Sequence, residues 1–168
     1  MQRAIVNKDE FEIQTATRRD LETLIDALGP EVGAGQIRKR FEDSVSGERI
    51  MLVAVKEGRA VGTVSIGGNR FRRRGSLRLF ALDVGTDSRR KGVGTALVNA
   101  VEEIATRGDL NEVNLEVGID NEDAIRLYLR LGYQISGDVV MDQWTKLDDD
   151  GSSETIEEPV FVMVKKLP

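Results

Sequence analysis

The spacing of hydrophobic residues alternates between the period of a strand and the period of a helix. Positions 11–15 alternate apolar and polar residues, which predicts a first strand. Apolar residues at helical spacing follow Thr17 and predict a helix that ends at Gly29-Pro30. A second helical stretch has a narrower apolar face, made by Ile37, Phe41 and Val45. We expect this helix at the edge of the core, where a small substrate can enter.

Strand patterns dominate the next part of the chain. Residues 50–55 and 60–66 are apolar, β-rich runs, and the four residues between them predict a hairpin. A turn over 67–75 contains an arginine cluster and leads into a strand that ends near Val84. We interpret the cluster as a solvated turn, because it lies at the opposite end of this strand from the glycine-rich stretch that follows.

A strand, a helix and a second strand follow one another over residues 79–117. The helical spacing begins near Val93 and closes near Gly108, and 113–117 then alternates as a strand. This order predicts a parallel pair with a right-handed crossover. Ligands of such sheets gather at the carboxyl ends of the strands, so we expect a site near Val84 and Val117.

The last third of the chain predicts one more helix and two strands. Asp120 or Asn121 is expected to cap a helix that ends before Gly132, and 133–137 is expected to form a strand. Residues 138–158 are predicted to be a loop.

A continuous apolar run at 160–164 then predicts a closing strand buried on both faces. We found no internal repeat and no linker, so we expect a single domain over 1–168.

The composition narrows the chemistry. With 40% hydrophobic and 32% charged residues, the 168-residue chain is typical of a soluble globular protein. The absence of cysteine and histidine excludes thiol nucleophiles, Cys/His zinc sites and Ser-His-Asp triads, and we expect no metal. Acid–base work is left to carboxylates, tyrosine or lysine. The net charge of -5 argues against nucleic acid, and the lack of a membrane span or secretory signal favours a cytoplasmic protein.

The glycine-rich stretch after Val84 has the features of an anion site. Amides at a helix start lack intrahelical partners, and the helix dipole adds partial positive charge there. Gly92 and Gly94 let oxygens approach the main chain, and three basic residues precede them. The P-loop pattern is absent, and Leu97 stands where a dinucleotide fingerprint needs a small residue. An ordinary glycine-containing loop is the alternative.

Two stretches carry a family resemblance. Arg89, Gly92 and Gly94 match the Arg-x-x-Gly-x-Gly motif of the GCN5-related N-acetyltransferases (GNAT). The second stretch is Leu115-Glu116-Val117, followed by Asn121, Ala124, Leu127-Tyr128 and Gly132-Tyr133. The chain therefore resembles this superfamily, most sharply over 79–133. The resemblance implies an α+β (α/β) fold with a mixed, mostly antiparallel sheet, a central splayed parallel strand pair and about four flanking helices.

The resemblance also implies acetyl-CoA as co-substrate, bound where the two parallel strands splay apart. The main chain of Leu82, Asp83 and Val84 would bind the pantetheine arm. Asn121 matches an asparagine that touches the cofactor, although helix capping alone would explain it. The pyrophosphate would be bound by Arg89, Arg90, Lys91, Gly92, Val93, Gly94 and Thr95.

Tyr128 matches the position of the general acid in the family. A phenol with a pKa of about 10 is protonated at neutral pH and can supply a proton to a thiolate of about 8.5. The alternative is a core aromatic residue on an apolar helix face. Glu116 is our first candidate for the base that takes the proton of the amine, and Asp83 or a water is the alternative. A solvated carboxylate on an open strand face is the competing interpretation of Glu116.

These residues predict an N-acetyltransferase that moves the acetyl group directly to a primary amine in a ternary complex. The acceptor stays open between a small-molecule amine and a peptide N-terminus, as does the oligomeric state, a homodimer included. The acidic segment 148–158 would favour a cationic amine if it borders the acceptor pocket, and is otherwise a solvated charge run. Trp144 would wall that pocket or pin the loop. A non-catalytic acyl-CoA-binding module is the alternative function, and RNA binding through Arg70–Arg74 is a third.

Overall fold

The computed structural model describes residues 11–67 and 74–168 of the chain. Most of the arginine cluster expected in a turn, and the RNA hypothesis that depends on it, lie outside the described residues. The described elements follow one another in an order that mixes strands and helices. They are β1 (Glu12–Thr15), α1 (Arg18–Val32), α2 (Ala34–Ser46), β2 (Ile50–Lys56), β3 (Arg59–Gly67), β4 (Ser76–Val84), the short 3-10 helix η1 (Thr86–Ser88), α3 (Val93–Arg107), β5 (Glu112–Gly118), α4 (Glu122–Arg130), β6 (Gln134–Ile135), β7 (Val140–Leu147) and β8 (Ser153–Lys166).

The described strands form one sheet in the order β1-β2-β3-β4-β5-β8-β6, with β7 paired to β8. Only β4 and β5 run parallel; the other pairs are antiparallel. Pairing between β4 and β5 is confined to Ser76–Arg78 against Glu112–Asn114. Beyond these residues β4 follows β3 and β5 follows β8, so the two strands separate. The predicted fold class and the splayed central pair are confirmed.

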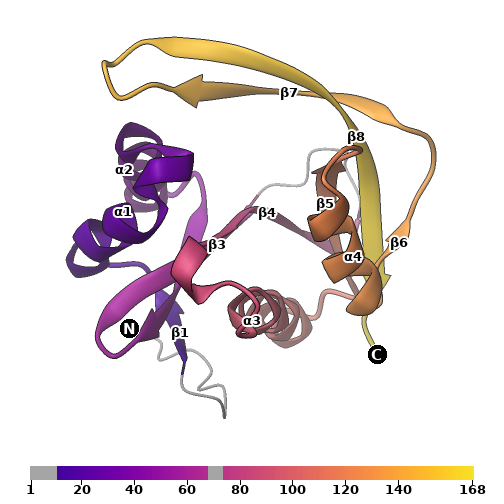
Figure 1. Cartoon of the computed structure of the whole chain (residues 1–168). Helices are drawn as coiled ribbons and strands as arrows, with labels where there is room; N and C mark the ends of the chain where they lie inside the picture. The colour runs from indigo at the N-terminus through magenta and orange to yellow at the C-terminus, as the bar shows by residue number, and fades with distance from the viewer. Residues whose placement is uncertain (1–10, 68–73) are drawn as a thin grey trace.

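Helices lie on the two sides of the sheet (Figure 1), and each side has its own hydrophobic cluster. On one face α3, the crossover between β4 and β5, buries Leu97 and Val101 against Leu79 and Leu115. On the other face α1 and α2 pack over β2 through residues that include Leu24, Leu28, Ile37, Phe41, Met51 and Val53. The helices α1 and α2 cover only one end of that face, so they do not cover the part of it where β4 and β5 separate.

The first helix is longer than its sequence pattern predicts. We expected α1 to end at Gly29-Pro30, but it continues to Val32 with Pro30 inside it. Proline has no N–H, so α1 forfeits the bond that residue 30 would donate to the carbonyl of Asp26, while the remaining amides of the last turn still find partners. The helix ends instead at Gly33, which has φ 94° and donates its amide to the carbonyl of Gly29.

The prediction of a loop over 138–158 is wrong. These residues form β7 and the first half of β8, a hairpin arm that extends above α1 and α2 (Figure 1). The arm projects beyond the main core, so its strands need no apolar face. Its sequence is therefore rich in charged residues and lacks the hydrophobic alternation from which strands are predicted. Asp150-Gly151 at its tip, with Gly151 at φ 89°, is the hairpin signal that marks this turn. The strand expected at 133–137 is only the two-residue β6.

Two hydrogen bonds join the tip of the hairpin arm to the start of α2. The Oδ1 atom of Asp149 accepts from the amide of Gly35 at 2.9 Å, and the amide of Leu147 donates to Oε1 of Gln36 at 2.7 Å. A Cβ atom on Gly35 would lie 3.2 Å from the carbonyl oxygen of Asp148, so glycine permits this close approach. The tip of the acidic segment is thus used to satisfy the helix start.

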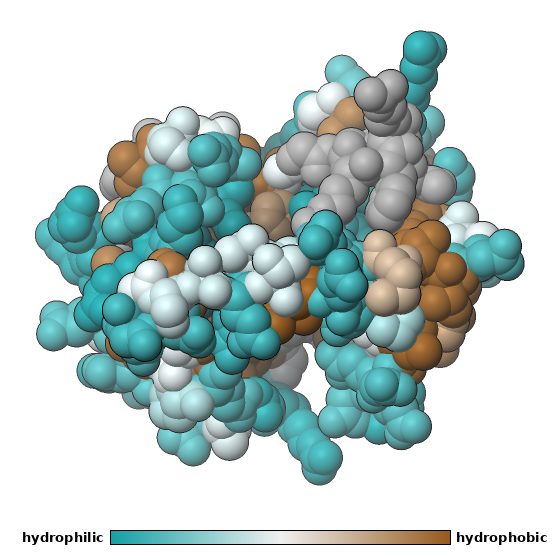
Figure 2. Space-filling view, turned by 90° about the horizontal axis from the view of Figure 1, so that it is seen from above, coloured by the Kyte–Doolittle hydropathy of each residue, from teal (hydrophilic) through white to brown (hydrophobic). Residues whose placement is uncertain are grey.

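The face seen from above carries mostly hydrophilic side chains, with hydrophobic ones gathered to one side (Figure 2). Among the described residues, the large apolar side chains with the highest exposure are Val45 and Met141. No helix in the described ranges is both long and apolar enough to cross a membrane.

Candidate active site

A bulge in β4 lies opposite the place where β5 leaves it. Phe80 pairs with Ser65 and Asp83 pairs with Thr63, so two residues of β4, Ala81 and Leu82, stand against one residue of β3. Ala81 has φ 53°, which is unusual for a residue with a side chain. The bulge therefore interrupts the ladder on one side of β4 where a partner strand is already missing on the other. This exposes main-chain groups to a bound molecule.

The start of α3 presents a run of unused amide donors. Gly92 caps this helix in the left-handed region, with φ 85° and ψ 7°, and Arg90 also has a positive φ of 60°. Among the described residues, no amide from Arg90 to Thr95 donates a hydrogen bond; the first to do so is that of Ala96, to Gly92 O at 2.9 Å. A Cβ atom on Gly92 would meet no atom within 4 Å. An open set of amides at a helix N-terminus fits an anion.

Arg89, the first residue of the glycine-rich motif, is engaged elsewhere. Its Nε atom donates to the carbonyl oxygen of Val84 at 3.2 Å, and its guanidinium pairs with Glu31 of α1. Thr86 donates to the same carboxylate at 3.0 Å. These donors, Arg89 first, lower the pKa of Glu31. The Arg89 side chain thus braces the end of β4 against α1, whereas Arg90 and Lys91 are exposed.

Tyr128 points from α4 into the main core. Its side chain is buried, and its ring meets that of Tyr133 edge to face, with 5.7 Å between centroids. Within the described residues its hydroxyl has no hydrogen-bond partner. Burial raises the pKa of the Tyr128 phenol, and the carboxylate of Asp83 raises it further.

Asn121 begins α4 beside the end of β5. Its Oδ1 atom accepts from the amide of Ala124 at 3.2 Å, so the residue is the N-cap of the helix. Its amide group is exposed. The capping role is therefore present, and contact with a cofactor remains a prediction.

Arg78, the last residue of β4 that pairs with β5, forms an ion pair with Glu116, which lies two residues past the end of that pairing on β5. The nitrogen and oxygen atoms lie 2.9 Å apart, and the side chains are only 13% and 4% exposed, respectively. The Arg78 guanidinium also stacks over the ring of Phe80, 4.3 Å from its centroid. The second carboxylate candidate, Asp83, pairs with Arg40 of α2 at 2.8 Å and is more exposed.

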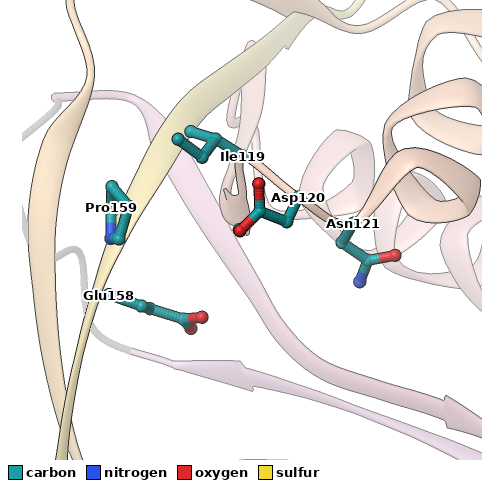
Figure 3. Close-up of a pocket in the computed structure, with 6 residues that line it drawn as sticks. Ile119, Asp120, Asn121, Glu158 and Pro159 are labelled. Carbon is teal, nitrogen blue, oxygen red and sulfur yellow. The ribbon is translucent and has the colours of Figure 1, made fainter.

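A hollow of ≈ 460 Å³ lies where β5 ends and β8 passes beside it. It is lined by Gly118–Asn121 of the β5–α4 connection and by Glu158 and Pro159 of β8. Figure 3 shows the Glu158 carboxylate pointing from β8 toward the Asp120–Asn121 turn. The indole nitrogen of Trp144 donates to Glu158 at 3.3 Å. The sequence analysis included Glu158 in the acidic segment 148–158 but placed that segment in a loop, so it could not say which of its carboxylates lines a hollow; the pairing of β7 with β8 decides this.

The comparisons agree with this geometry. A family model for the acetyltransferase (GNAT) family matches residues 18–133, which is more than half of the chain. The chain belongs to the acetyltransferase (GNAT) family. The resemblance seen in the two motifs is thereby confirmed.

Individual relatives are similar over parts of their length. An uncharacterized N-acetyltransferase of Methanocaldococcus jannaschii is 33% identical over 101 residues, which are 58% of this chain and 42% of that protein. N-alpha-acetyltransferase 30 of Xenopus laevis is 43% identical over 61 residues, 36% of this chain and 22% of that protein. The chain thus matches less than half the length of these curated relatives.

Solved structures of acetyltransferases share the fold over nearly the whole chain. A ribosomal-protein-alanine N-acetyltransferase from Brucella melitensis has a TM-score of 0.67 at 22% identity, covering 92% of this chain and 99% of that chain.

Proposed function

We propose that this protein transfers the acetyl group of acetyl-CoA to a primary amine by direct attack in a ternary complex. The observation that carries the proposal is the combination of two open features at the ends of β4 and β5. One is the gap beyond Arg78 and Asn114, and the other is the run of unused amides at the start of α3. Family membership supports the same reaction.

The proposed cofactor site uses main-chain groups more than side chains. Amides from Arg90 to Thr95 would hold the diphosphate, with Arg90 and Lys91 adding charge. The main chain of Leu82–Val84 would hold the pantetheine arm at the bulge. The Arg89 side chain contacts Val84 and Glu31, so we propose that it holds the loop in position and does not itself contact the diphosphate. When bound, acetyl-CoA supplies the activated thioester.

Tyr128 would donate a hydrogen bond to the leaving sulfur. Its pKa is raised by burial, so the phenol stays protonated at neutral pH. The same rise makes complete transfer of the proton to the departing thiolate unfavourable, because the conjugate thiol has a pKa of only about 8.5; hydrogen-bond donation is therefore the form of acid assistance that this environment supports. A hydroxyl that has no partner among the described residues suits that task.

Glu116 is the proposed acceptor of the amine proton, directly or through water. Both Glu116 and Asp83 already accept a charged hydrogen bond from arginine, so pairing does not distinguish them. Position favours Glu116, which lies on β5 two residues past the last β4–β5 pair, at the base of the gap. With neither cysteine nor histidine in the chain, an acetyl-enzyme intermediate is hard to form, which favours direct transfer.

The names of the relatives bear on the acceptor. One acetylates protein N-termini by its name, and another acts on an alanine of a ribosomal protein. A peptide N-terminus is therefore one acceptor to test, beside small amines. A non-catalytic acyl-CoA-binding module is the second candidate, and the charge pairing of both carboxylates is the observation that favours it.

The test is release of free thiol from acetyl-CoA in the presence of amines. A panel of peptide N-termini, polyamines and aminoglycosides is screened, and calorimetry measures acetyl-CoA binding in parallel. We expect thiol release that depends on the added amine. Tight acetyl-CoA binding without turnover across the whole panel would instead establish the binding module, and absence of both would contradict the proposal.

A further inference from the structure

We propose that Glu158 selects an acceptor that carries a second positive charge besides the amine that is acetylated. This inference rests on the proposed function and deepens it, because it assigns a substrate class to the same face of the sheet. Three observations support it: the face of the sheet on which Glu158 lies, the contacts that hold its carboxylate, and the hollow that the carboxylate faces.

Strand register places Glu158 on the same face of the sheet as Glu116. Glu116 pairs with Val162 and Gly118 pairs with Val160, so the side chains within each pair share a face. Residues two apart on a strand also share a face, which puts Glu158 with Val160 and Val162. This face is opposite the one packed on α3, because Leu115 and Val117 belong to the main core. Glu158 therefore borders the side of the gap where Arg78 and Glu116 lie.

The Glu158 carboxylate is held in place by groups that leave its charge intact. The indole of Trp144 donates to Oε1 at 3.3 Å, and an indole N–H is a neutral donor. A Cβ atom on Gly118 would lie 3.3 Å from Oε2, so glycine leaves just enough room for the carboxylate. Trp144 therefore helps to fix the position of Glu158.

The carboxylates that line the hollow differ from those nearer the base of the gap in whether an arginine or lysine pairs with them. Asp83 and Glu116 are each paired with an arginine. In the described ranges no lysine or arginine pairs with Glu158 or with Asp120, the two carboxylates that line the hollow. Figure 3 shows both carboxylates facing the space between the β5–α4 turn and β8. A hollow of ≈ 460 Å³ with this lining fits an ammonium or guanidinium group with its chain.

The strand geometry also gives a length for the acceptor. Glu158 lies four residues along β8 from Val162, the partner of Glu116, which is about 13 Å at a rise of about 3.3 Å per residue. An acceptor whose reacting amine lies near Glu116 must therefore carry its second charge on the order of 10 Å away. A long diamine and a peptide with a basic side chain both meet this requirement, and the experiment distinguishes them.

The experiment compares matched acceptors with and without the second charge. For the purified protein with acetyl-CoA, kcat/KM is measured for diaminooctane against octylamine. The same measurement is made for a short peptide with lysine at its second position against the norleucine peptide. We expect the charged member of one pair to be preferred by about tenfold or more, the effect of one ion pair of about 1.4 kcal/mol. The pair that shows the preference identifies the source of the charge.

Substitutions then locate that preference. Glu158→Gln should reduce the charged-to-neutral ratio of kcat/KM toward one, and Trp144→Phe should reduce it in part. Glu157→Gln is the matched control, because it removes the same charge from the neighbouring residue, which pairs with Gln143 on the opposite face. The ratio should be unchanged in this control.

Three results would overturn the inference. They are equal kcat/KM within both pairs, an unchanged ratio in Glu158→Gln, and an equal loss in Glu157→Gln. A calorimetric titration of diaminooctane into the wild-type protein and Glu158→Gln examines the hollow without turnover. Weaker binding to the variant supports the inference even if no amine is acetylated, in which case the proposed function alone fails; equal binding contradicts the inference alone.

Discussion

Tyr128 is the residue on which the chemistry of the account depends most. Because its hydroxyl has no hydrogen-bond partner among the described residues, Tyr128→Phe should cost less than about 1 kcal/mol of stability. Loss of acid assistance should nevertheless lower kcat by about 100-fold. Stopped thiol-release assays and urea unfolding measure the two effects. Full activity in the variant would remove Tyr128 from the mechanism, and weakened CoA binding would point to a packing role instead.

The two tyrosines of the chain offer a test of their environment. Tyr128 and Tyr133 both have a pKa raised above the ordinary value of 10.0, chiefly by burial; for Tyr133 the Glu102 carboxylate adds to the rise. Both phenols should therefore stay protonated at pH values where exposed tyrosine ionises. Above pH 10 the folded protein keeps the two phenol protons that the unfolded chain releases. The free energy of unfolding should therefore be unaffected by these groups below pH 10 and should fall above it.

Near-ultraviolet titration of tyrosinate on the native protein checks this expectation. No tyrosinate should form near pH 10 until the protein unfolds. Circular dichroism follows unfolding in parallel. If either tyrosine ionises near pH 10 while the protein is still folded, its side chain is not buried as described.

Single residues were the least predictable level. The motif residues Gly92 and Asn121 could be placed from the sequence because their backbone requirements, a left-handed conformation and a helix cap, are local. The partner of Arg89 on α1 and the partner of Glu116 on β4 could not be placed, because both are set by tertiary packing. Within the acidic segment 148–158, the carboxylate of Glu158 could not be singled out for the same reason.

At the scale of elements, the start of α3 makes a prediction about coenzyme A. Gly92→Val should lower CoA affinity by more than about tenfold, or about 1.4 kcal/mol, because a branched side chain would fill the open space above the amides. Calorimetry with CoA measures the loss.

Gly137→Val is the matched control for that substitution. Gly137 also has a positive φ, 77°, and open space around its Cβ direction, so the backbone strain is comparable. The control should lose stability to a similar extent while retaining CoA affinity. Equal CoA affinity in both variants would refute the anion site at α3.

The hairpin arm makes a second prediction at this scale. Asp149 supplies from the arm tip the side-chain acceptor that α2 lacks at its own N-terminus, since Gly33 has no side-chain cap. Asp149→Ala should therefore destabilise the protein by about 1 kcal/mol, as loss of a helix cap does, and Asp149→Asn should restore most of it. Urea unfolding measures both. An equal loss in the two variants would show that charge, and not capping, holds the arm.

Elements with a buried face were predicted well, and those without one were not. The strands and helices around Leu79, Leu97 and Leu115 repeat apolar residues at the period that their packing requires. The arm of β7 and β8 packs little of its length against the core, so its alternation is weak and it was taken for a loop. The end of α1 was predicted wrongly for the opposite reason. Gly29-Pro30 is a strong local signal for the end of a helix, but α1 continues through it to Val32.

At the scale of the whole molecule, the order of elements determines where a substrate can lie. The crossover through α3 makes β4 and β5 neighbours, and because they pair over only three residues, the remainder of each strand has no hydrogen-bonded partner in the other. The amides of α3 lie at one side of this gap and the ion pair of Arg78 with Glu116 at the other. The parallel pair was predictable from strand, helix and strand in sequence, whereas the extent of the splay was implied only by the family resemblance.

The most direct measurement of the central claim is a crystal structure of the protein grown with coenzyme A. The account predicts the diphosphate on the amides between Arg90 and Thr95, the pantetheine arm along Leu82–Val84 and the sulfur within hydrogen-bond reach of the Tyr128 hydroxyl. A structure with coenzyme A bound elsewhere, or with β4 and β5 paired through to Val84 and Gly118, would contradict it.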